Sequence, residues 1–205
     1  MPKIIAMSDT HNRHKDIVMP ECDIIIHAGD ATNGGEHNEL APFLNWLSQQ
    51  KSKYKVYVPG NHDAYVQRMP EKSRRMCEDR GITLLIDEGV ELDGLKLWGS
   101  PYTPFFGNWS FQYYPGEGAL THWSKIPNNL DILITHGPAY QMLDVGMLGE
   151  NAGCYYLFYK ILETKPKAHI CGHIHDGYGQ KLFDGIKFYN VACGGNENPP
   201  TEILL

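Results

Sequence analysis

Five short polar motifs in this chain carry side chains of the types that bind divalent metal ions in proteins. In chain order, the motifs are Asp9-Thr10-His11, Gly29-Asp30, Gly60-Asn61-His62-Asp63, His136 and Gly172-His173-Ile174-His175. Their donors are carboxylate, amide and imidazole groups, and no motif contains a thiolate. This donor set favours manganese, iron, zinc, cobalt or nickel chemistry over a structural zinc knot.

The spacing within two motifs predicts how their ligands act together. In an extended loop the side chains alternate with a period of two, so Asp9 and His11 should point the same way and bind one ion. The same parity applies to His173 and His175. Asp30 follows a glycine that permits a tight turn, and the two oxygens of a carboxylate are suited to bridging two cations. We therefore expect a two-metal site that Asp30 bridges.

Each motif follows a short apolar run that is typical of a buried β-strand. The runs are rich in Ile and Val, and turn-forming residues bound them. They cover residues 3–7, 23–26, 55–58, 131–134 and 167–170. Because α/β sheets place their sites on loops that leave the carboxyl ends of strands, all five motifs should lie on one rim.

Helical patterns alternate with these strands in the first half of the chain. A helix is predicted over residues 36–50, where four apolar side chains recur at helical spacing, namely Leu40, Phe43, Leu44 and Leu47. A second helix is predicted over residues 70–80, and Gly81 is well placed to end it. Alternation of this kind predicts βαβ units and a parallel sheet.

The second half of the chain shows antiparallel signals. Residues 82–87, 90–92 and 95–98 suggest a hairpin or meander around Asp93-Gly94. The same pattern recurs around Asp184-Gly185, with strands over 178–183 and 186–191 and a last strand over 202–205. The predicted fold is therefore α/β, with two stacked mixed sheets flanked by helices in four layers and one domain over residues 1–205. Residues 99–116 and 137–153 have no assigned element, and loops of that length often serve function.

The net charge and the cysteines limit which partners and which cellular compartment are expected. The 18 basic and 24 acidic residues give a net charge of −6, which disfavours long nucleic acid as a partner but not a small phosphate substrate. The odd number and wide spacing of the cysteines predict reduced thiols at Cys22, Cys77, Cys154, Cys171 and Cys193. With no apolar run of membrane-spanning length and no signal segment after Met1, we expect a cytoplasmic protein without a membrane partner.

The five motifs together resemble those of the calcineurin-like metallophosphoesterase superfamily, which run Asp-x-His, Gly-Asp, Gly-Asn-His-Asp/Glu, His and Gly-His-x-His. The closer resemblance is to its small metallophosphoesterase-domain (MPPED-like) group. That resemblance rests on Ser8-Asp9-Thr10-His11, His27-Ala28-Gly29-Asp30, Trp98-Gly99-Ser100-Pro101-Tyr102-Thr103-Pro104, Thr135-His136-Gly137-Pro138 and Gly177-Tyr178-Gly179. Some members of the group have Gly where this chain has His173, so a fully loaded second metal is expected here.

The resemblance implies a role for each motif residue. Two divalent ions are expected, with Mn²⁺ favoured over Fe, Zn²⁺, Co²⁺ or Ni²⁺. The first ion would be held by Asp9, His11, Asp30 and His175, and the second by Asp30, Asn61, His136 and His173. A metal-bridging hydroxide would attack the phosphorus in line, and His62 would act as general acid toward the leaving group. Asp63 is expected to cap the helix that begins nearby, and Gly29, Gly60 and Gly172 to permit tight turns.

Candidate substrate contacts lie beside the motifs. Asn12 and Arg13 follow the first motif and could reach a phosphate oxygen, although a solvated arginine fits the pattern equally well. Tyr102 belongs to an aromatic-rich stretch that would offer a nucleobase a flat wall or would pack over the sheet edge. The members of this stretch are Trp98, Tyr102, Phe105, Phe106, Trp109 and Phe111. Residues 144–153 are a candidate lid, and His27 is expected to be a buried, hydrogen-bonded residue.

The expected function is that of a dinuclear metal-dependent phosphohydrolase, most simply a phosphodiesterase on small esters such as cyclic nucleotides. The preference for diesters rests on the resemblance and the aromatic stretch, because such a metal site suits monoesters and diesters alike. The alternatives are a phosphomonoesterase, including a protein phosphatase, and a nuclease, which the acidic balance disfavours. A non-enzymatic scaffold of the same fold is disfavoured because no ligand motif is broken.

Overall fold

The first of two facing sheets contains the strands that lead into the first three motifs. In the computed structural model, which describes residues 2–195 and 197–205, this sheet has the order β13-β1-β2-β3-β4. Its strands are β1 (Ile4–Met7), β2 (Ile24–Ala28), β3 (Tyr54–Val58), β4 (Thr83–Leu84) and β13 (Thr201–Ile203). Strands β1 to β4 are parallel, and β13 pairs antiparallel with β1. Parallel pairing places the ends of β1, β2 and β3 at one edge.

The second sheet contains the strands that lead into the other two motifs. Its order is β11-β12-β10-β9-β6-β5, with parallel strands in the middle and an antiparallel hairpin at each edge. Its strands are β5 (Glu88–Leu92), β6 (Leu95–Ser100), β9 (Ile132–Thr135), β10 (Ala168–Cys171), β11 (Gly179–Phe183) and β12 (Ile186–Asn190). A separate two-stranded ribbon joins β7 (Thr103–Pro104) to β8 (Gln112–Tyr113).

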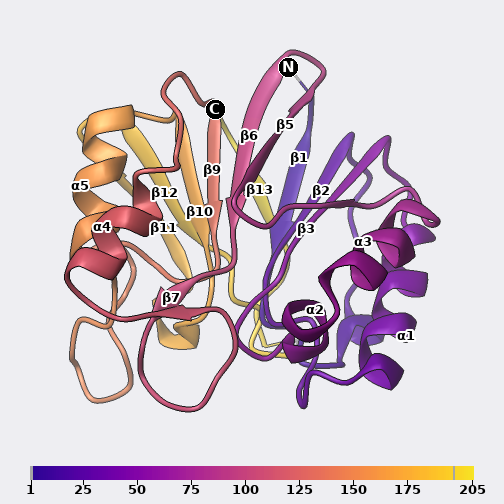
Figure 1. The fold of residues 1–205 in the computed structure, drawn as a ribbon. Helices are drawn as coiled ribbons and strands as arrows, with labels where there is room; N and C mark the ends of the chain where they lie inside the picture. The colour runs from indigo at the N-terminus through magenta and orange to yellow at the C-terminus, as the bar shows by residue number, and fades with distance from the viewer. Residues whose placement is uncertain (1, 196) are drawn as a thin grey trace.

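Helices cover the outer face of each sheet, which gives the four layers seen in Figure 1. The first sheet is covered by α1 (His37–Ser48), α2 (Ala64–Arg68) and α3 (Pro70–Glu78), and the second by α4 (Glu117–Trp123) and α5 (Tyr155–Thr164). Two short 3₁₀ helices, η1 (His14–Asp16) and η2 (His175–Gly177), lie in loops. The described helices do not include one that is both long and apolar enough to cross a membrane.

The central strands β1, β2, β9 and β10 are largely apolar because both of their faces are buried. Ile26 on β2 belongs to the core between the sheets, together with Ile134 on β9 and Ile170 on β10. The neighbouring Ile25 points the other way and packs with Phe43 of α1. Burial of each such side chain contributes roughly 1.5–3 kcal/mol to folding, so the two sheets are held at a fixed separation.

Most of the predicted elements are confirmed. The five apolar runs form β1, β2, β3, β9 and β10, the two predicted helices form α1 and α3, and Gly81 follows α3 with a φ of 65°. The hairpins around Asp93-Gly94 and Asp184-Gly185 and the last strand are also present. The fold class of two stacked mixed sheets flanked by helices is therefore correct.

For the second half of the chain, one predicted element was wrong and two helices were missed. Residues 82–87 were predicted in an antiparallel unit, but β4 pairs parallel with β3 and completes the first sheet. Helices α4 and α5 were not predicted. The α5 residues Leu157, Ile161 and Thr164 are buried at helical spacing, but tyrosines and phenylalanine dominate its first turns and obscure the pattern.

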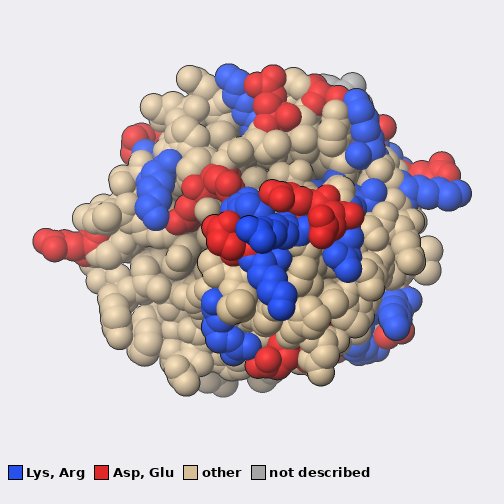
Figure 2. All heavy atoms as spheres, turned by 45° about the vertical axis from the view of Figure 1, so that its right-hand side comes forward, with Lys and Arg blue, Asp and Glu red and all other residues tan. Residues whose placement is uncertain are grey.

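The charged side chains are mixed in sign on the face shown in Figure 2, where the side that carries α1 and α3 comes forward. Lysine and arginine groups alternate there with aspartate and glutamate groups. On this face of the described residues no broad basic patch is present. All five cysteines are free, as the sequence predicted.

Candidate dimetal site

The five motifs meet at one rim of the molecule, below the carboxyl ends of the strands in Figure 1. Asp9, Asp30 and Asn61 each follow a strand of the first sheet within three residues. His136 and His173 follow β9 and β10 of the second sheet. The facing sheets therefore bring donors from distant parts of the chain into one place.

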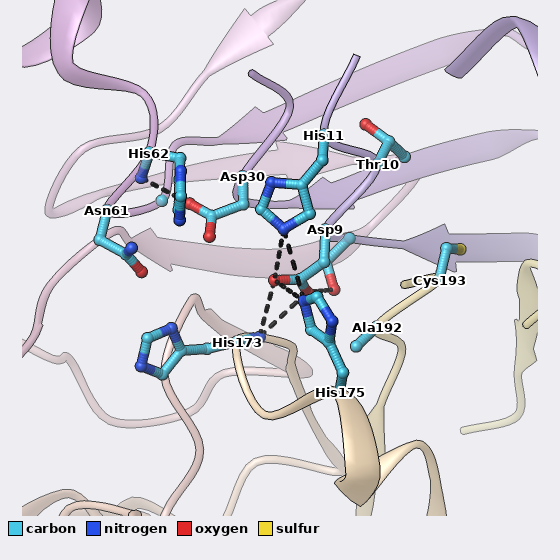
Figure 3. Close-up of polar contacts among 12 residues, drawn as sticks. Asp9, Thr10, His11, Asp30, Asn61, His62, His173, His175, Ala192 and Cys193 are labelled. Atoms are coloured by element: carbon cyan, nitrogen blue, oxygen red, sulfur yellow. Dashed lines mark hydrogen bonds and ion pairs between the residues drawn. The ribbon is translucent and has the colours of Figure 1, made fainter. Parts of the chain in front are cut away.

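A first cluster contains Asp9, His11 and His175. The Nε2 atoms of the two histidines lie 3.4 Å apart, and Oδ1 of Asp9 lies 3.4 Å from Nε2 of His175 and 4.0 Å from Nε2 of His11 (Figure 3). Nδ1 of His11 donates to the backbone carbonyl of Thr32 at 3.3 Å. Since a carbonyl only accepts, the Nε2 lone pair of His11 is left to face the cluster.

A second cluster contains Asp30, His136 and His173, with Asn61 beside it. Nε2 of His136 lies 3.2 Å from Oδ2 of Asp30 and 2.9 Å from Oδ1 of Asn61. Nδ1 of His136 donates to the carbonyl of Ala28 at 2.9 Å. As in the first cluster, a backbone carbonyl selects the tautomer that turns Nε2 toward the carboxylate.

His62 lies between the two clusters, in a group with His11 and Asp30. Its backbone N–H donates to Oδ1 of Asp30 at 2.8 Å (Figure 3), and its Nδ1 donates to the carbonyl of Asn33 at 2.6 Å. The ring lies 4.8 Å from that of His11. The side chain is therefore fixed, and its Nε2 has no partner within the described residues.

The loops that carry these residues are not extended, contrary to the prediction. Asp9, His11, Asp30 and His173 have φ angles of 55°, 42°, 55° and 69°, in the left-handed region. Such backbone costs of order 1–3 kcal/mol per non-glycine residue and is concentrated at functional sites. Asp9 and His11 still meet, but the parity argument was wrong for His175, which joins the first cluster while His173 joins the second.

Backbone hydrogen bonds hold the strained loops against one another. The N–H of His173 donates to both oxygens of Asp9, at 2.9 and 3.2 Å (Figure 3). The N–H of Asp9 donates to the carbonyl of Gly29 at 2.8 Å, and that of His11 to the carbonyl of Asp30 at 3.1 Å. The loop of one sheet thus orients the carboxylate of the other.

The motif glycines are needed for two different reasons. Gly29 has a φ of 107°, so the predicted tight turn is present. Gly60 and Gly172 also begin tight turns, in which Asp63 N and Ile174 N donate to their carbonyls at 3.1 and 2.8 Å, but their φ angles are ordinary. A Cβ at Gly60 would collide with the Asp30 carboxylate, and one at Gly172 would collide with Asp9. Glycine is required at these two positions because the donors pack directly against the backbone.

The two carboxylates are buried, with 0% of Asp9 and 2% of Asp30 exposed. Burial by itself would raise the pKa of Asp9, but the hydrogen bond and charge of His175 hold that pKa well below its usual range. In the same way, His136 outweighs the burial of Asp30 and lowers its pKa. Both carboxylates are therefore ionised near neutral pH and need nearby positive charge.

The pKa values of the histidines beside these carboxylates are shifted in opposite directions. Burial would lower the pKa of His136, but the Asp30 carboxylate raises it to about 9. The hydrogen bond to Asp9 raises the pKa of His175. Burial lowers the pKa of His173 to about 4, with the positive charge of His136 acting in the same direction. Protonated imidazole thus supplies the positive charge that bound cations would supply, and the donor set fits divalent ions.

Asp63 does not have the predicted role. It stands at the N-cap position of α2, but its side chain makes no capping hydrogen bond. Its carboxylate instead accepts from Gly60 N at 2.8 Å, Ala31 N at 3.3 Å, and the N and Oγ1 of Thr32 at 3.0 and 2.8 Å. Asp63 therefore joins the loop after β3 to the loop after β2.

The three candidate substrate residues contact other groups. The Asn12 amide donates to Glu39 at 2.6 Å, and half-exposed Arg13 pairs with Asp16 at 3.4 Å. The Tyr102 ring packs on that of His122 at 4.4 Å between centroids. Their roles toward substrate stay predictions. The expected burial of His27 is confirmed, and its Nε2 lies 3.1 Å from the Thr10 hydroxyl.

The aromatic stretch divides into packed and site-facing members. Trp109 lies 4.3 Å from the His62 ring, and Phe106 lies 5.1 Å from the His173 ring. Phe111 is buried, and Trp98 packs against the core beneath α4 and α5. Sequence alone did not separate these members, because their approach to His62 or to the core depends on tertiary contacts.

Comparisons with known proteins agree with this geometry. The family model described as Calcineurin-like phosphoesterase matches residues 2–177, a range that includes all five motifs. The chain therefore belongs to the calcineurin-like phosphoesterase family. Its sheets and helices also match the crystal structure of Phosphopantetheinyl Hydrolase from Mycobacterium tuberculosis, with a TM-score of 0.71 at 17% identity over 98% of this chain and 95% of that one.

Curated relatives include proteins of different length. The chain is 34% identical to human Metallophosphoesterase domain-containing protein 1 over 231 residues, which cover 99% of this chain and 71% of that protein. It is 37% identical over 194 residues to Probable rhamnogalacturonate lyase C of Emericella nidulans, covering 88% of this chain but 18% of that protein. The chain thus matches a small part of the second relative and most of the first.

Proposed function

We propose that this phosphoesterase is a dinuclear metal-dependent phosphodiesterase that acts on small esters such as cyclic nucleotides. The observation that carries the proposal is the convergence of two donor clusters from both sheets around the buried carboxylates of Asp9 and Asp30. Its partners would be small phosphate esters, not long nucleic acid or membranes.

The residues fit two ions that share one ligand. Asp9, His11 and His175 would hold the first ion, and Asn61, His136 and His173 the second, with Asp30 between them. When bound, divalent ions, with Mn²⁺ favoured, supply positive charge for an anionic ester and acidify a water. The chain contributes fixed tautomers and a buried setting in which these charges act strongly.

His62 is the proposed general acid. The hydrogen bond from its Nδ1 to Asn33 holds the ring, so that a proton on Nε2 can pass to the departing oxygen of the ester. Its backbone N–H also orients Asp30. One turn of chain therefore positions a ligand and the proton donor together.

The charge of the site favours a diester over a monoester. A phosphomonoester carries a second negative charge near neutral pH, which proteins usually meet with arginine or lysine. Among the described residues, the hydrogen bonds and ion pairs of the two clusters include no Lys or Arg side chain, and Arg13 is paired with Asp16. A monoanionic diester needs no such group.

The test combines metal content with a substrate panel. Elemental analysis of protein loaded with Mn²⁺ should find two ions per chain, and Asp30→Ala should lose both. Turnover should be faster on cyclic nucleotides and bis-nitrophenyl phosphate than on nitrophenyl phosphate or a phosphopeptide. The reverse order would indicate a phosphomonoesterase, and two bound ions without turnover would indicate a scaffold.

A further inference from the structure

Two half-exposed aromatic side chains stand at the mouth of the proposed site. Phe106 is 49% exposed and Trp109 is 46% exposed. Their rings stack at 6.4 Å between centroids with an interplanar angle of 26°. Trp109 contacts the proposed acid His62, and Phe106 contacts His173 of the second cluster. The pair therefore extends from the leaving-group side of the site to the second cluster.

The loop that carries the pair is fixed at both ends. Strands β7 and β8 pair at its base, where Thr103 N donates to the Phe111 carbonyl at 2.9 Å. Directly after Trp109, Ser110 N donates to the carbonyl of Asn61 at 3.3 Å. The loop that carries the aromatic pair is thus hydrogen-bonded, through Ser110, to the same turn that carries Asn61 and His62.

We propose that Phe106 and Trp109 form a subsite for a planar aromatic ring, such as a nucleobase, carried by the departing alcohol of the ester. The inference rests on the proposed function and deepens it by naming the substrate class. Neighbouring aromatic faces left half exposed beside a polar site are typical of ligand-binding grooves. Because the subsite has no charged side chain of its own, a neutral ring fits it.

Stacking of this kind tolerates different rings because every base has a π face. The contribution of one stacked base corresponds to about a 5- to 100-fold change in affinity. The subsite should therefore discriminate strongly between aromatic and aliphatic esters and only weakly between adenine and guanine.

The first test compares two cyclic diesters that differ in the base. Adenosine 3′,5′-cyclic phosphate contains the six-membered phosphate ring, and trimethylene phosphate has that ring alone. In Phe106→Ala and Trp109→Ala, kcat/KM should fall about 5- to 100-fold for the nucleotide and less than about twofold for trimethylene phosphate. Trp109→Phe should restore most of the loss. Equal losses on both substrates would overturn the subsite and leave Trp109 only as a support for His62.

Phe105→Ala is the matched control. Phe105 lies on the same loop and is 48% exposed, but its ring stacks on Tyr114 at 5.0 Å and, among the described residues, pairs with no histidine ring of the two clusters. Phe105→Ala should leave kcat/KM unchanged for both substrates. A loss as large as that of Phe106→Ala would mean that the loop, not the pair, matters, and would overturn the proposal.

A binding test separates this inference from the proposed function. Calorimetry with Mn²⁺-loaded protein compares adenosine monophosphate, phenyl phosphate and inorganic phosphate, and it needs no turnover. The subsite predicts that both aromatic ligands bind more tightly than phosphate, and that Trp109→Ala removes the difference. If adenosine monophosphate binds more tightly than phenyl phosphate, the subsite prefers a nucleobase. If the two bind equally, the subsite accepts any aryl ring. If inorganic phosphate binds as tightly as the two aromatic ligands, the proposed subsite is ruled out, even if the enzyme hydrolyses phosphodiesters.

Discussion

Histidine tautomers determine what the individual side chains of the site can do. Nδ1 of His11, His62 and His136 each donates to a backbone carbonyl at the end of β2 or in the loop after it, and Nε2 is thereby turned toward the site. The three acceptors are the carbonyls of Thr32, Asn33 and Ala28. The same local device thus serves two proposed ligands and the proposed acid.

Replacing His62 with asparagine should separate proton delivery from metal binding. His62→Asn should keep both ions but lose about 10²–10⁴-fold in kcat on esters with a poor leaving group. The loss should be much smaller with nitrophenolate, which needs no proton to depart. Elemental analysis is the control for metal content. Equal losses on both kinds of ester would rule out the acid role.

The stability of the metal-free protein should fall as pH rises above neutrality. The pKa of His136 is raised from 6.5 to about 9, so protonated His136 stabilises the fold fully below pH 6.5, and this contribution is lost as pH rises through about 9. Asp9 acts in the opposite sense, because its lowered pKa stabilises the fold above pH 3.8 and this contribution is lost on acidification.

Urea midpoints measured in EDTA between pH 5 and pH 10 test this prediction. The native chain should be most stable near pH 5–6.5 and should weaken steadily toward pH 9. His136→Asn should weaken less over that upper range, because His175 alone keeps a raised pKa there. A midpoint that rises between pH 7 and pH 9 in the native chain would contradict the linkage.

The helices and loops next to the strands hold the ligand loops in place. Glu39, in the first turn of α1, accepts from Gly34 N at 2.9 Å, Glu36 N at 3.1 Å and the Asn12 amide at 2.6 Å. Asp63, at the start of α2, joins the loops after β2 and β3. The beginnings of these helices therefore act as supports for the site.

Asp63→Asn should loosen these two loops. An amide NH₂ cannot accept from a backbone N–H, so buried donors lose their partners at a cost of about 1–3 kcal/mol. The free energy of unfolding should fall by that amount, and metal affinity should fall because Asp30 and Asn61 lie on the joined loops. Asp79→Asn, at an exposed position at the end of α3, is the control for the charge change. Unchanged stability in Asp63→Asn would contradict the assignment.

Helix α1 contains an interior proline that offers a second test. Pro42 lies at the sixth position of α1 and is exposed. Pro42→Ala should stabilise the protein by about 2 kcal/mol. A proline inside a helix destabilises the folded state by about 3 kcal/mol, and its stiffening of the unfolded chain offsets this by up to about 1 kcal/mol. Pro70, the first residue of α3, is the matched control, because proline is tolerated there. Urea unfolding should show the gain only at Pro42, and equal gains at both positions would contradict it.

At the scale of the whole molecule, the site joins the two halves of the sandwich. Asp9, Asp30 and Asn61 follow strands of the first sheet, whereas His136 and His173 follow strands of the second. The sheets already share an apolar core. Bound ions would add a polar link at the rim, so metal binding and global stability should be coupled.

Metal loading should therefore raise the thermal midpoint. Free Mn²⁺ at 100 times its dissociation constant adds about 2.7 kcal/mol, which corresponds to about 5–10 °C for a chain of this length. Scanning calorimetry with Mn²⁺ and with EDTA measures the shift. Asp30→Ala should abolish the response, and Asp79→Asn should keep it. An equal midpoint with and without Mn²⁺ would contradict the coupling.

The donor types, the strands that precede them and the two-sheet fold could be predicted from local sequence patterns. Apolar runs and turn residues report burial locally, so β1, β2, β3, β9 and β10 were found, and each motif could be placed at a strand end. Tertiary structure decided where each ligand points. It gave Asp63 its contacts across loops and brought Trp109 against His62. It also placed His173 and His175 in different clusters, a division that the family resemblance implied but the spacing argument missed. These outcomes depend on left-handed backbone and on contacts between remote loops, which residue periodicity does not encode.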